Sequence, residues 1–395
     1  MTKRVAVVVS HPIQHFVPQY SSWARLVGVD IKVFFASRQG LDAYEDKGFG
    51  RVVNWDQMVL DFNHEFLPGA AGKPTGSGID CIEISERLQD FSPDAVVVYG
   101  YSQALQRRTI RWATGAKVPL LMIADSELRR RRSRLLRPVK AIILPRILRK
   151  IDLFLTVGDA NEAYYRHYGA LDETFIRCSF PVDVKAFDAV KPTRSEIGVR
   201  LREELGIPSS HKVVLTVGKL VPGKRQADLI AFSNAVQSRR RDITVVLAGS
   251  GHDEESLKAK ALKVGPGGVL FAGFVHPSKL VEYYAAADLY AHCSEVEAHS
   301  LAISEAIYSG LPVVASNRCG SFGPSDDVRP GLNGFVYPCG NIAELSSALM
   351  MIIDRIDLQV SMGRESEAIA SANQALAHGK ALMQSLEVLA SGKER

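Results

Sequence analysis

At the centre of the sequence AADLYAHCSEVEAHSLAISEAIYSGLPVVAS, residues 286–316, seven residues separate the carboxylates of Glu297 and Glu305. A short apolar run at 288–293 precedes the pair and another at 312–315 follows it. Runs of this length and composition predict β-strands. The stretch therefore predicts a strand, a loop, a helix and a second strand, which is the repeating unit of a parallel α/β sheet.

The loop and the helix of this unit hold one glutamate each. Ser300 can cap a helix that begins at Leu301 and is ended by Gly310, so Glu297 lies on the loop and Glu305 lies in the helix. If both were helical they would lie roughly 12 Å apart, whereas an acid/base pair acting on a glycosidic bond is separated by about 5 to 9.5 Å. The spacing favours two contacts with different parts of one ligand. The alternative is a solvated pair that faces outward.

The composition is that of a globular protein with two domains. The chain has 395 residues, of which 46% are hydrophobic, and this is enough for two cores. The net charge of +5 is small for this length, so the total charge does not indicate nucleic-acid binding. Five cysteines lie far apart without a CxxC pair, which indicates free thiols in a reducing compartment and no zinc site.

The N-terminal sequence, MTKRVAVVVSHPIQH, predicts a first β-strand and no signal peptide. Its apolar run of about five residues is shorter than the apolar region of a signal peptide. No other run approaches the ~20 apolar residues of a membrane-spanning helix. We therefore expect a cytoplasmic protein.

Short apolar runs alternate with amphipathic segments along the chain, which predicts two doubly wound α/β domains. The predicted strands are 5–9, 31–35, 95–99, 119–123 and 153–157, then 213–217, 244–248, 269–272, 289–292, 313–315 and 335–337. The expected division is a first domain, a second domain and a C-terminal helix that returns to the first domain, at 1–190, 191–375 and 376–395. Two such domains form a cleft at the carboxyl ends of their strands.

A turn with two lysines follows the first strand of the second half. The sequence VGKLVPGKRQADLIAF places Lys219 and Lys224 on either side of Pro222 and Gly223, just before a helix. Lysines and the N–H groups of a helix N-terminus together form an anion site, although the GxxxxGK[ST] order of a Walker A loop is absent. The alternative is two surface lysines in a turn.

A glycine turn, AGSG at 248–251, follows the next strand. Glu254 occupies the third glycine position of the GxGxxG pattern, so the dinucleotide-binding fingerprint is incomplete. We expect a tight turn between a strand and a helix, and no nicotinamide cofactor.

Taken in order, these motifs resemble the C-terminal half of the retaining GT-B glycosyltransferases of family 4, or group 1. The motifs VGKLVPGK, AGSG, FAGFV, YYAAADLYAHCS and GLPVVAS, together with Glu297 and Glu305, cover 213–349. The resemblance implies a GT-B fold with two Rossmann-like domains facing a cleft. It further implies sugar transfer from a nucleotide diphosphate sugar, UDP- or GDP-linked, with retention of the anomeric configuration and with no metal ion or other cofactor.

The resemblance also implies roles for individual residues. Lys219, where the family commonly has Arg, and Lys224 would neutralise the diphosphate, and Glu297 would contact hydroxyls of the transferred sugar; these are the expected catalytic residues. Glu305 would accept hydrogen bonds from the ribose. The other expected donor-binding residues are Gly218 beside the lysines, Phe274 and Val275 at the nucleobase, and His299, Ser300 and Leu301 near the β-phosphate.

One position departs from the family. Where EGFG is common, this chain has Glu297, Ala298, His299 and Ser300, so two glycines are lost and a titratable ring is added. The N–H groups of Ser300 and Leu301 can still donate to the β-phosphate. His299 either adds a donor there or packs into the protein.

The first half is expected to bind the acceptor, which is a glycan, a glycolipid or a lipid-linked intermediate. His11 and Asp125 each follow a predicted strand and are therefore placed at the cleft. His15 is expected on the next helix in a structural role. A polar segment at 38–78, with Trp and Asp at 55–56, is a further acceptor candidate because loops this long are often functional.

Residues 129–150, RRRRSRLLRPVKAIILPRILRK, contain many cations and no acidic residue. Apolar residues interleave with the cations, as in a helix that lies on an anionic membrane. Three interpretations stay open: contact with a membrane surface or lipid diphosphate, an anionic acceptor, and a solvated face. Nucleic acid is not favoured, because aromatic residues for stacking are absent. The candidate contacts are Arg129, Arg130, Arg131, Arg132 and Arg134.

Two other functions share parts of this pattern, namely a sugar-nucleotide epimerase of the same fold and a non-catalytic module that binds nucleotide sugars. The set of Lys219, Lys224, Glu297 and Glu305 matches the transferases better than the epimerases. A non-catalytic module would be expected to lack one of the four. The leading hypothesis is a retaining glycosyltransferase that makes part of a cell-surface glycan or glycolipid, either free in the cytoplasm or peripheral on the inner face of the membrane.

Overall fold

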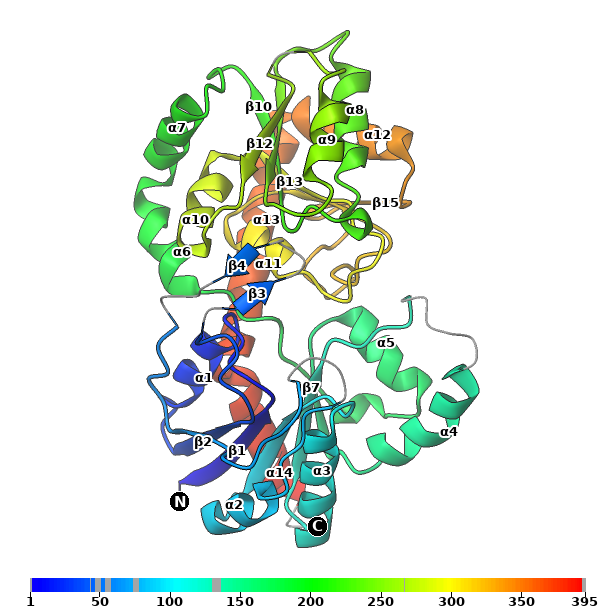
Figure 1. Ribbon diagram of the computed structural model, residues 1–395. Coiled ribbons are helices and arrows are strands. Elements are labelled where there is room, and N and C mark those ends of the chain that lie inside the picture. Colours follow the sequence, from blue (N-terminus) through cyan, green and yellow to red (C-terminus); the bar gives the residue numbers. More distant parts are fainter. Residues whose placement is uncertain are drawn as a thin grey trace.

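The computed structural model describes residues 2–42, 44–46, 51–53, 58–73, 78–129, 136–265 and 267–392. They form two parallel β-sheets with helices on both faces (Figure 1). The first sheet lies in the lower half of the figure and the second in the upper half. The expected pair of doubly wound domains is confirmed.

The first sheet has the strand order β5-β2-β1-β6-β7-β8-β9, and each neighbouring pair is parallel. Its central strands are runs of β-branched residues buried on both faces, which is typical of a parallel sheet between helices. The strands are β1 (Lys3–Val9), β2 (Val29–Phe35), β5 (His64–Phe66), β6 (Ala95–Tyr99), β7 (Leu120–Ala124), β8 (Leu153–Thr156) and β9 (Phe175–Arg177). The helices are α1 (Val17–Trp23), α2 (Ile84–Phe91), α3 (Ala104–Ala116), α4 (Leu136–Leu148) and α5 (Asp159–His167).

The second sheet has the order β12-β11-β10-β13-β14-β15 and is also parallel. The strands are β10 (Lys212–Val217), β11 (Ile243–Ala248), β12 (Val269–Gly273), β13 (Leu289–His292), β14 (Val313–Ser316) and β15 (Gly334–Tyr337). The helices are α6 (Val184–Val190), α7 (Arg194–Glu204), α8 (Ala227–Val236), α9 (Glu254–Ala261), α10 (Pro277–Ala286), α11 (Leu301–Tyr308), α12 (Ile342–Ile353) and α13 (Ile356–Ala375). The carboxyl ends of this sheet face the first sheet, so its loops meet the first domain.

The chain passes between the sheets twice. The first passage runs from β9 to α6, and α6 packs on α10 of the second sheet although the predicted boundary at residue 190 assigns it to the first domain. The second passage is α13, which continues through a π-helical turn at Leu376–Lys380 into α14 (Ala381–Gly392). The positions of the domain boundaries stay a prediction.

The C-terminal helix packs on the first domain, as expected. Ala381, Leu382 and Leu386 of α14 belong to the hydrophobic core formed by β1, β2 and α1. At the preceding turn, the side chains of Gln19 and Trp23 both donate to the carbonyl oxygen of residue 377, at 2.9 and 3.0 Å. The last helix therefore completes the core that the first residues of the chain begin.

The segment at 38–78 contains more structure than a long polar loop. It forms a two-stranded antiparallel ribbon, β3 (Tyr44–Asp46) and β4 (Arg51–Val53), and then the edge strand β5 of the first sheet. Residues 55–56, the acceptor candidate in this segment, lie outside the described residues.

Candidate active site

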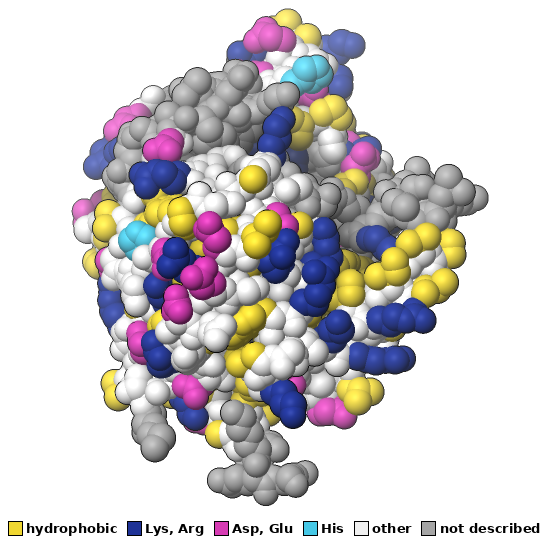
Figure 2. Space-filling view, turned by 60° about the horizontal axis from the view of Figure 1, so that its bottom comes forward, with side chains coloured by type: hydrophobic (Ala, Val, Ile, Leu, Met, Phe, Trp, Pro, Cys, Tyr) yellow, Lys and Arg dark blue, Asp and Glu magenta, His cyan; other side chains and the backbone are white. Residues whose placement is uncertain are grey.

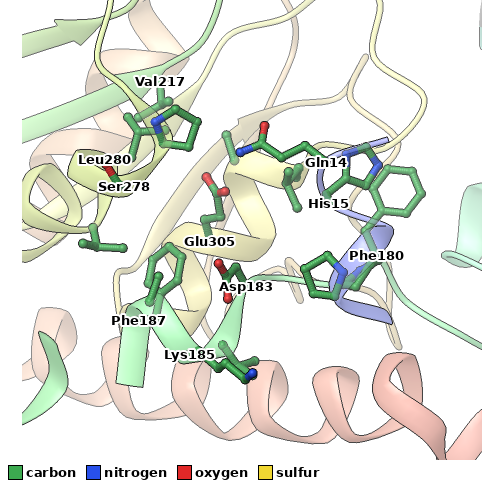
Figure 3. A pocket seen from close by; sticks show the side chains of 18 of the residues that line it. Gln14, His15, Phe180, Asp183, Lys185, Phe187, Val217, Ser278, Leu280 and Glu305 are labelled. Carbon is green, nitrogen blue, oxygen red and sulfur yellow. The ribbon is translucent and has the colours of Figure 1, made fainter. Parts of the chain in front are cut away.

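A cavity of about 930 Å³ lies between the two sheets, at the carboxyl ends of the strands of the second sheet. Figure 3 shows that its walls come from both domains: Gln14 and His15 precede α1, Asp183 precedes α6, and Phe187 and Glu305 lie on α6 and α11. A cavity of this size can hold a nucleotide sugar, since ligand sites typically measure about 300 to 1,000 Å³.

The donor-side residues expected from the sequence all border this cavity. They come from the segments after β10, β12 and β13 and from helix α11, because the carboxyl ends of parallel strands lie at the same edge. The residues are Gly218, Lys219, Lys224, Phe274, Val275, Glu297, His299, Ser300, Leu301 and Glu305. The structure brings this set together, and the role of each member stays a prediction.

Lys224 and Glu297 form an ion pair within the cavity. Glu297 also lies 3.3 Å from Nε2 of His292 and accepts a hydrogen bond from Ser294 Oγ at 3.2 Å. Burial alone would raise the pKa of Glu297, but the hydrogen bond from His292 and the charge of Lys224 outweigh burial and lower the pKa to about 2. Glu297 is therefore ionised at neutral pH and holds the ammonium group of Lys224.

Glu305 has a different environment. Its carboxylate accepts a hydrogen bond from Tyr284 Oη at 2.8 Å, and Asp183 lies near it on the same side of the cavity (Figure 3). Burial raises the pKa of Glu305 to about 7, with the negative charge of Asp183 adding to the shift and the tyrosine opposing it. The two glutamates of the sequence motif thus differ in charge state near neutral pH.

Close backbone contacts hold the lysine-bearing turn in place. β10 ends at Val217, and the N–H of Gly218 donates to the carbonyl of Ala248 at 3.0 Å. Gly249 has a φ of +156°, and a Cβ at this position would lie 1.9 Å from the carbonyl oxygen of Gly218. The position therefore requires glycine. The AGSG sequence forms the expected tight turn and supports the neighbouring lysine turn.

Helix α11 begins at Leu301, as predicted, but Ser300 does not cap it through its side chain. The N–H of Ser300 instead donates to Ser321 Oγ at 2.7 Å. A phosphate oxygen can accept from this N–H only if it replaces Ser321. The sequence gives no sign of this competition, because Ser321 lies twenty-one residues further along the chain.

The ring of His299 is buried and does not extend into the cavity. Its side chain is 1% exposed and lies 3.2 Å from a carboxylate oxygen of Asp327. Of the two alternatives for His299, packing is the one observed. His299 borders the cavity, and whether its ring adds a donor to the donor site stays a prediction.

On the acceptor side, the cavity is lined by a different histidine from the one selected in the sequence. His11 and Asp125 are not among the described residues that line the cavity. His11 lies against its neighbour, with Nδ1 2.8 Å from Ser10 Oγ, and Asp125 is exposed. His15, expected to be structural, lines the cavity in the turn before α1, where burial lowers its pKa to about 4. The turn at residues 14–16 was not predicted, and it is what directs His15 inward.

The sequence profile described as "Glycosyl transferases group 1" matches residues 200–368. The chain is a glycosyltransferase, and its second domain matches the group 1 family. The match covers the second sheet and most of its helices, and it contains each of the ten donor-side residues that border the cavity.

Curated relatives extend the similarity beyond the second domain. Over 352 residues, the glycosyltransferase is 26% identical to the GDP-mannose-dependent monoacylated alpha-(1-6)-phosphatidylinositol monomannoside mannosyltransferase of Corynebacterium glutamicum, and the alignment covers 85% of this chain and 84% of that protein. It is 33% identical over 117 residues to the alpha-monoglucosyldiacylglycerol synthase of Streptococcus pneumoniae, which is 29% of this chain and 26% of that protein.

Solved structures share the fold of the glycosyltransferase over its whole length. The Anabaena protein Alr3699/HepE, solved in complex with UDP, superposes with a TM-score of 0.69 at 18% identity and covers 99% of this chain and 100% of its own. A glycosyltransferase from Rickettsia africae has a TM-score of 0.71 at 14% identity, with coverages of 98% and 97%. The fold is therefore GT-B, as expected.

The basic stretch of the glycosyltransferase is only partly described. Arg130, Arg131, Arg132 and Arg134 lie outside the described residues. The guanidinium of Arg129 donates to the carbonyl of Cys319 at 3.1 Å and lies over the ring of Phe322, so it connects the two domains. Its role as a membrane or acceptor contact stays a prediction.

Helix α4, which follows the arginines, has one buried and one exposed side. Leu144 and Leu148 are buried, whereas Val139, Ile142 and Ile143 are about half exposed, at 49%, 59% and 50%. Figure 2 views the molecule after its lower end has been turned forward, and hydrophobic and basic side chains lie next to one another on the right of this view. Across the described residues, no helix has the length and apolar composition needed to cross a bilayer.

Proposed function

We propose that this glycosyltransferase transfers a sugar from a nucleoside diphosphate sugar to an acceptor, with retention of the anomeric configuration and without a metal ion, as family 4 enzymes do. The observation that carries the proposal is the meeting of Lys219, Lys224, Glu297 and Glu305 in one cavity between the domains. Two cations and two carboxylates at this edge of a parallel sheet complement a ligand that has both phosphates and sugar hydroxyls.

In this proposal the diphosphate binds to Lys219 and Lys224. Because Lys224 already contacts Glu297, the diphosphate becomes a second anionic partner of the same ammonium group. The carboxylate of Glu297 then both orients Lys224 and accepts hydrogen bonds from the transferred sugar. The N-terminus of α11, at Leu301, adds its partial positive charge on the same side of the cavity.

The nucleoside occupies the part of the cavity lined by α10 and α11. Glu305 accepts hydrogen bonds from the ribose hydroxyls in its ionised form, while Tyr284 holds the carboxylate in position. Phe274 and Val275 lie after β12 and contact the base. These positions require the donor to span the cavity from β12 to the loop after β13.

Transfer breaks the bond between the anomeric carbon and the β-phosphate oxygen, and it forms a bond from that carbon to the acceptor oxygen on the same face. The acceptor's proton passes to the departing phosphate oxygen, so no protein base is required. Negative charge develops on the diphosphate, where fixed lysines stabilise it in a site shielded from water. The lysines and the helix N-terminus supply the positive charge that a metal ion provides in other transferases.

The donor is best sought among mannosyl and glucosyl nucleotides. The Corynebacterium relative is named as GDP-mannose-dependent, and Anabaena HepE was solved with UDP and with UDP-glucose. A thermal-shift screen of the purified chain with UDP, GDP, UDP-glucose and GDP-mannose tests the proposal. We expect the nucleotides that carry one of the two bases to raise the unfolding temperature of the wild type and to have little effect on that of Glu305→Ala. If none of the four stabilises the wild type, the donor-site assignment is wrong.

We further propose that the acceptor is lipid-linked and that the enzyme works peripherally at the cytoplasmic face of a membrane. Two named relatives act on, or synthesise, glycolipids: a phosphatidylinositol mannoside and a glucosyldiacylglycerol. In this chain, the exposed apolar residues of α4 lie close to Arg146, Arg149 and Lys150, all of which are exposed. Apolar side chains beside cations match the interface of an anionic bilayer.

A further inference from the structure

The loop between β13 and α11, residues 293–300, carries Glu297 and is called the donor loop. Three buried side chains in or near it form a cluster that the proposed reaction does not use. His299, Asp326 and Asp327 are each at most 5% exposed, and we call them the His299 cluster. Nε2 of His299 lies 3.2 Å from an oxygen of Asp327, and Nδ1 lies 3.9 Å from an oxygen of Asp326. One ring thus lies between two carboxylates.

Asp326 connects this cluster to the first domain. Its carboxylate accepts a hydrogen bond from the N–H of Asp159, the first residue of α5, at 2.7 Å. A Cβ at Gly158 would lie 2.4 Å from that same carboxylate, so glycine is what permits the approach. The side chain of Arg177, from β9, donates to the carbonyl of Ser325 at 3.3 Å. Asp326 therefore lies in a polar contact between the domains.

Asp327 connects the cluster to the helices of the second domain. It accepts hydrogen bonds from Ser304 Oγ on α11 at 2.6 Å and from Asn373 Nδ2 on α13 at 2.7 Å. The ring of His299 also meets the edge of Phe180, in the first passage, at 4.8 Å between centroids. His299 therefore touches Phe180 in the first passage. It also lies beside Asp326, which binds the first domain, and Asp327, which binds helices of the second domain.

A bound metal ion is not needed to explain this arrangement. All four carboxylate oxygens of Asp326 and Asp327 already accept hydrogen bonds, from Asp159, Ser304, Asn373 and the N–H of Asp327. What the two buried carboxylates lack is a positive charge, and a protonated His299 supplies it.

The charges around the ring favour its protonated form. Burial lowers the pKa of His299, but the hydrogen bond and charge of Asp327, with the charges of Asp326 and Asp125, outweigh burial and raise the pKa above its ordinary value. Burial raises the pKa of Asp326 to about 6, while His299 and Arg177 oppose this shift. The ring thus lies between two buried carboxylates whose charges favour the imidazolium form.

We propose that protonated His299 is a positioning residue that holds the donor loop in register with the first domain through Asp326, so that sugar transfer depends on its charge. This inference rests on the proposed function. His299 lies two residues after Glu297 and two residues before Leu301, where α11 begins, so a shift of its backbone displaces both. The ring itself does not face the donor, so its loss changes turnover and leaves donor binding in place.

The first experiment measures release of nucleoside diphosphate from GDP-mannose or UDP-glucose, whichever the wild type accepts, from about pH 7 to about pH 9.5. We expect the wild-type kcat to fall as His299 loses its proton. His299→Asn is expected to be at least about tenfold slower at pH 7, because a small displacement of the reacting groups has large kinetic effects. Its profile should be flatter, with KM for the donor within about twofold of wild type.

The matched control is His252→Asn. His252 is exposed, pairs with Asp253 at 2.7 Å and does not border the cavity, so its kcat profile should equal that of the wild type. A wild-type profile in His299→Asn overturns the inference. A wild type that neither binds nor cleaves any nucleotide sugar contradicts the proposed function instead, and a second measurement then decides on His299.

That measurement is thermal unfolding, which needs no substrate. Because the folded-state pKa of His299 is raised, its stabilising effect is complete below about pH 6.5 and is lost as pH rises through the raised value. The unfolding temperature of His299→Asn should lie below that of the wild type at pH 7 and approach it by about pH 9.5. The substitution Asp326→Asn removes the charge of the residue that accepts from the first domain. In a protein that carries Asp326→Asn, adding His299→Asn should therefore lower the unfolding temperature by less than it does in the wild type. A constant difference across pH, or a stoichiometric divalent metal in the purified protein, would refute the charged-histidine assignment.

Discussion

The contact between Lys224 and Glu297 changes how a substitution of either residue is interpreted. From the sequence, each has its own contact with the donor. In the structure they form one ion pair, with His292 beyond it. Removing the lysine therefore also removes the ammonium group that is paired with Glu297. A substitution here reports on the pair rather than on one side chain.

For Lys224→Ala we expect a large loss of turnover and a retained fold. Removal of one preorganised group that stabilises a developing anion costs about 2.7 to 4 kcal/mol of transition-state stabilisation, or about 10²- to 10³-fold in kcat. Initial rates of nucleoside diphosphate release, with circular dichroism to check folding, measure the effect. Lys258→Ala is the control, because Lys258 lies on α9 in surface ion pairs with Glu254 and Glu255. Equal rates for the two variants would remove Lys224 from the site.

Glu305 leads to a pH-dependent prediction. Its pKa of about 7 reflects burial, so near neutrality a large fraction of the free protein carries a protonated Glu305. Ribose hydroxyls donate to the ionised form, and donor binding therefore weakens as pH falls through about 7, approaching tenfold per unit below it. Calorimetric titration with a nucleotide sugar between about pH 5.5 and about pH 8.5 measures this slope. Glu305→Gln should bind weakly at every pH, and a slope that survives in this variant belongs to another group.

Some residues could be placed from the sequence and others could not. Lys219, Lys224, Glu297 and Glu305 follow strands, and the parallel-sheet pattern brings strand ends to one edge, so their meeting in a cavity was predictable. The ring of His299 and the N–H of Ser300 were not, because their partners, Asp327 and Ser321, come from a loop with no periodic pattern.

At the level of elements, the strands of the second sheet match their predictions to within one residue at each end. Each is a run of four to six mostly β-branched or apolar residues, for which pattern and structure agree. β3, β4, β5 and β9 were missed, and each has only three residues. Such strands are too short for alternation to appear in the sequence.

The turn at Gly249 gives a prediction at this scale. In Gly249→Ala the new Cβ would meet the carbonyl oxygen of Gly218, a backbone atom that cannot move without displacing the lysine turn. We expect the free energy of unfolding to fall by about 1 to 3 kcal/mol, with weaker binding of nucleotide as well. Denaturant unfolding and the thermal-shift screen measure the two effects.

Gly115→Ala is the matched control for this change. Gly115 lies in α3, and a Cβ there meets no atom within 4 Å, so alanine should stabilise the helix by about 0.5 to 1 kcal/mol. If both alanines behave alike, the close approach of the two turns is not the reason for glycine at position 249.

At the scale of the whole molecule, the exposed side of α4 leads to a prediction about membrane binding. We expect the wild type to sediment with anionic liposomes and less so at high salt, because screening weakens contacts between basic residues and lipid head groups. Ile142→Ser combined with Ile143→Ser should reduce the bound fraction without unfolding the chain, since both side chains are at least half exposed.

The control for the liposome experiment is Leu262→Ser. Leu262 is 86% exposed and follows α9 in the other domain, so this change removes a similar apolar side chain elsewhere on the surface. If sedimentation depends neither on salt nor on the two isoleucines, the exposed side of α4 is a solvated face and not a membrane contact.

The return of α14 to the first domain affects the order in which the protein can fold during synthesis. Strand β9 ends at Arg177, yet the core around β1 and α1 also contains Ala381, Leu382 and Leu386. Roughly 200 residues must therefore be translated after the first sheet is complete before that core can close, on the order of 10 to 40 seconds at 5 to 20 residues per second. During this interval the face that later receives α14 is exposed on the nascent chain, and there the growing polypeptide most needs protection from aggregation.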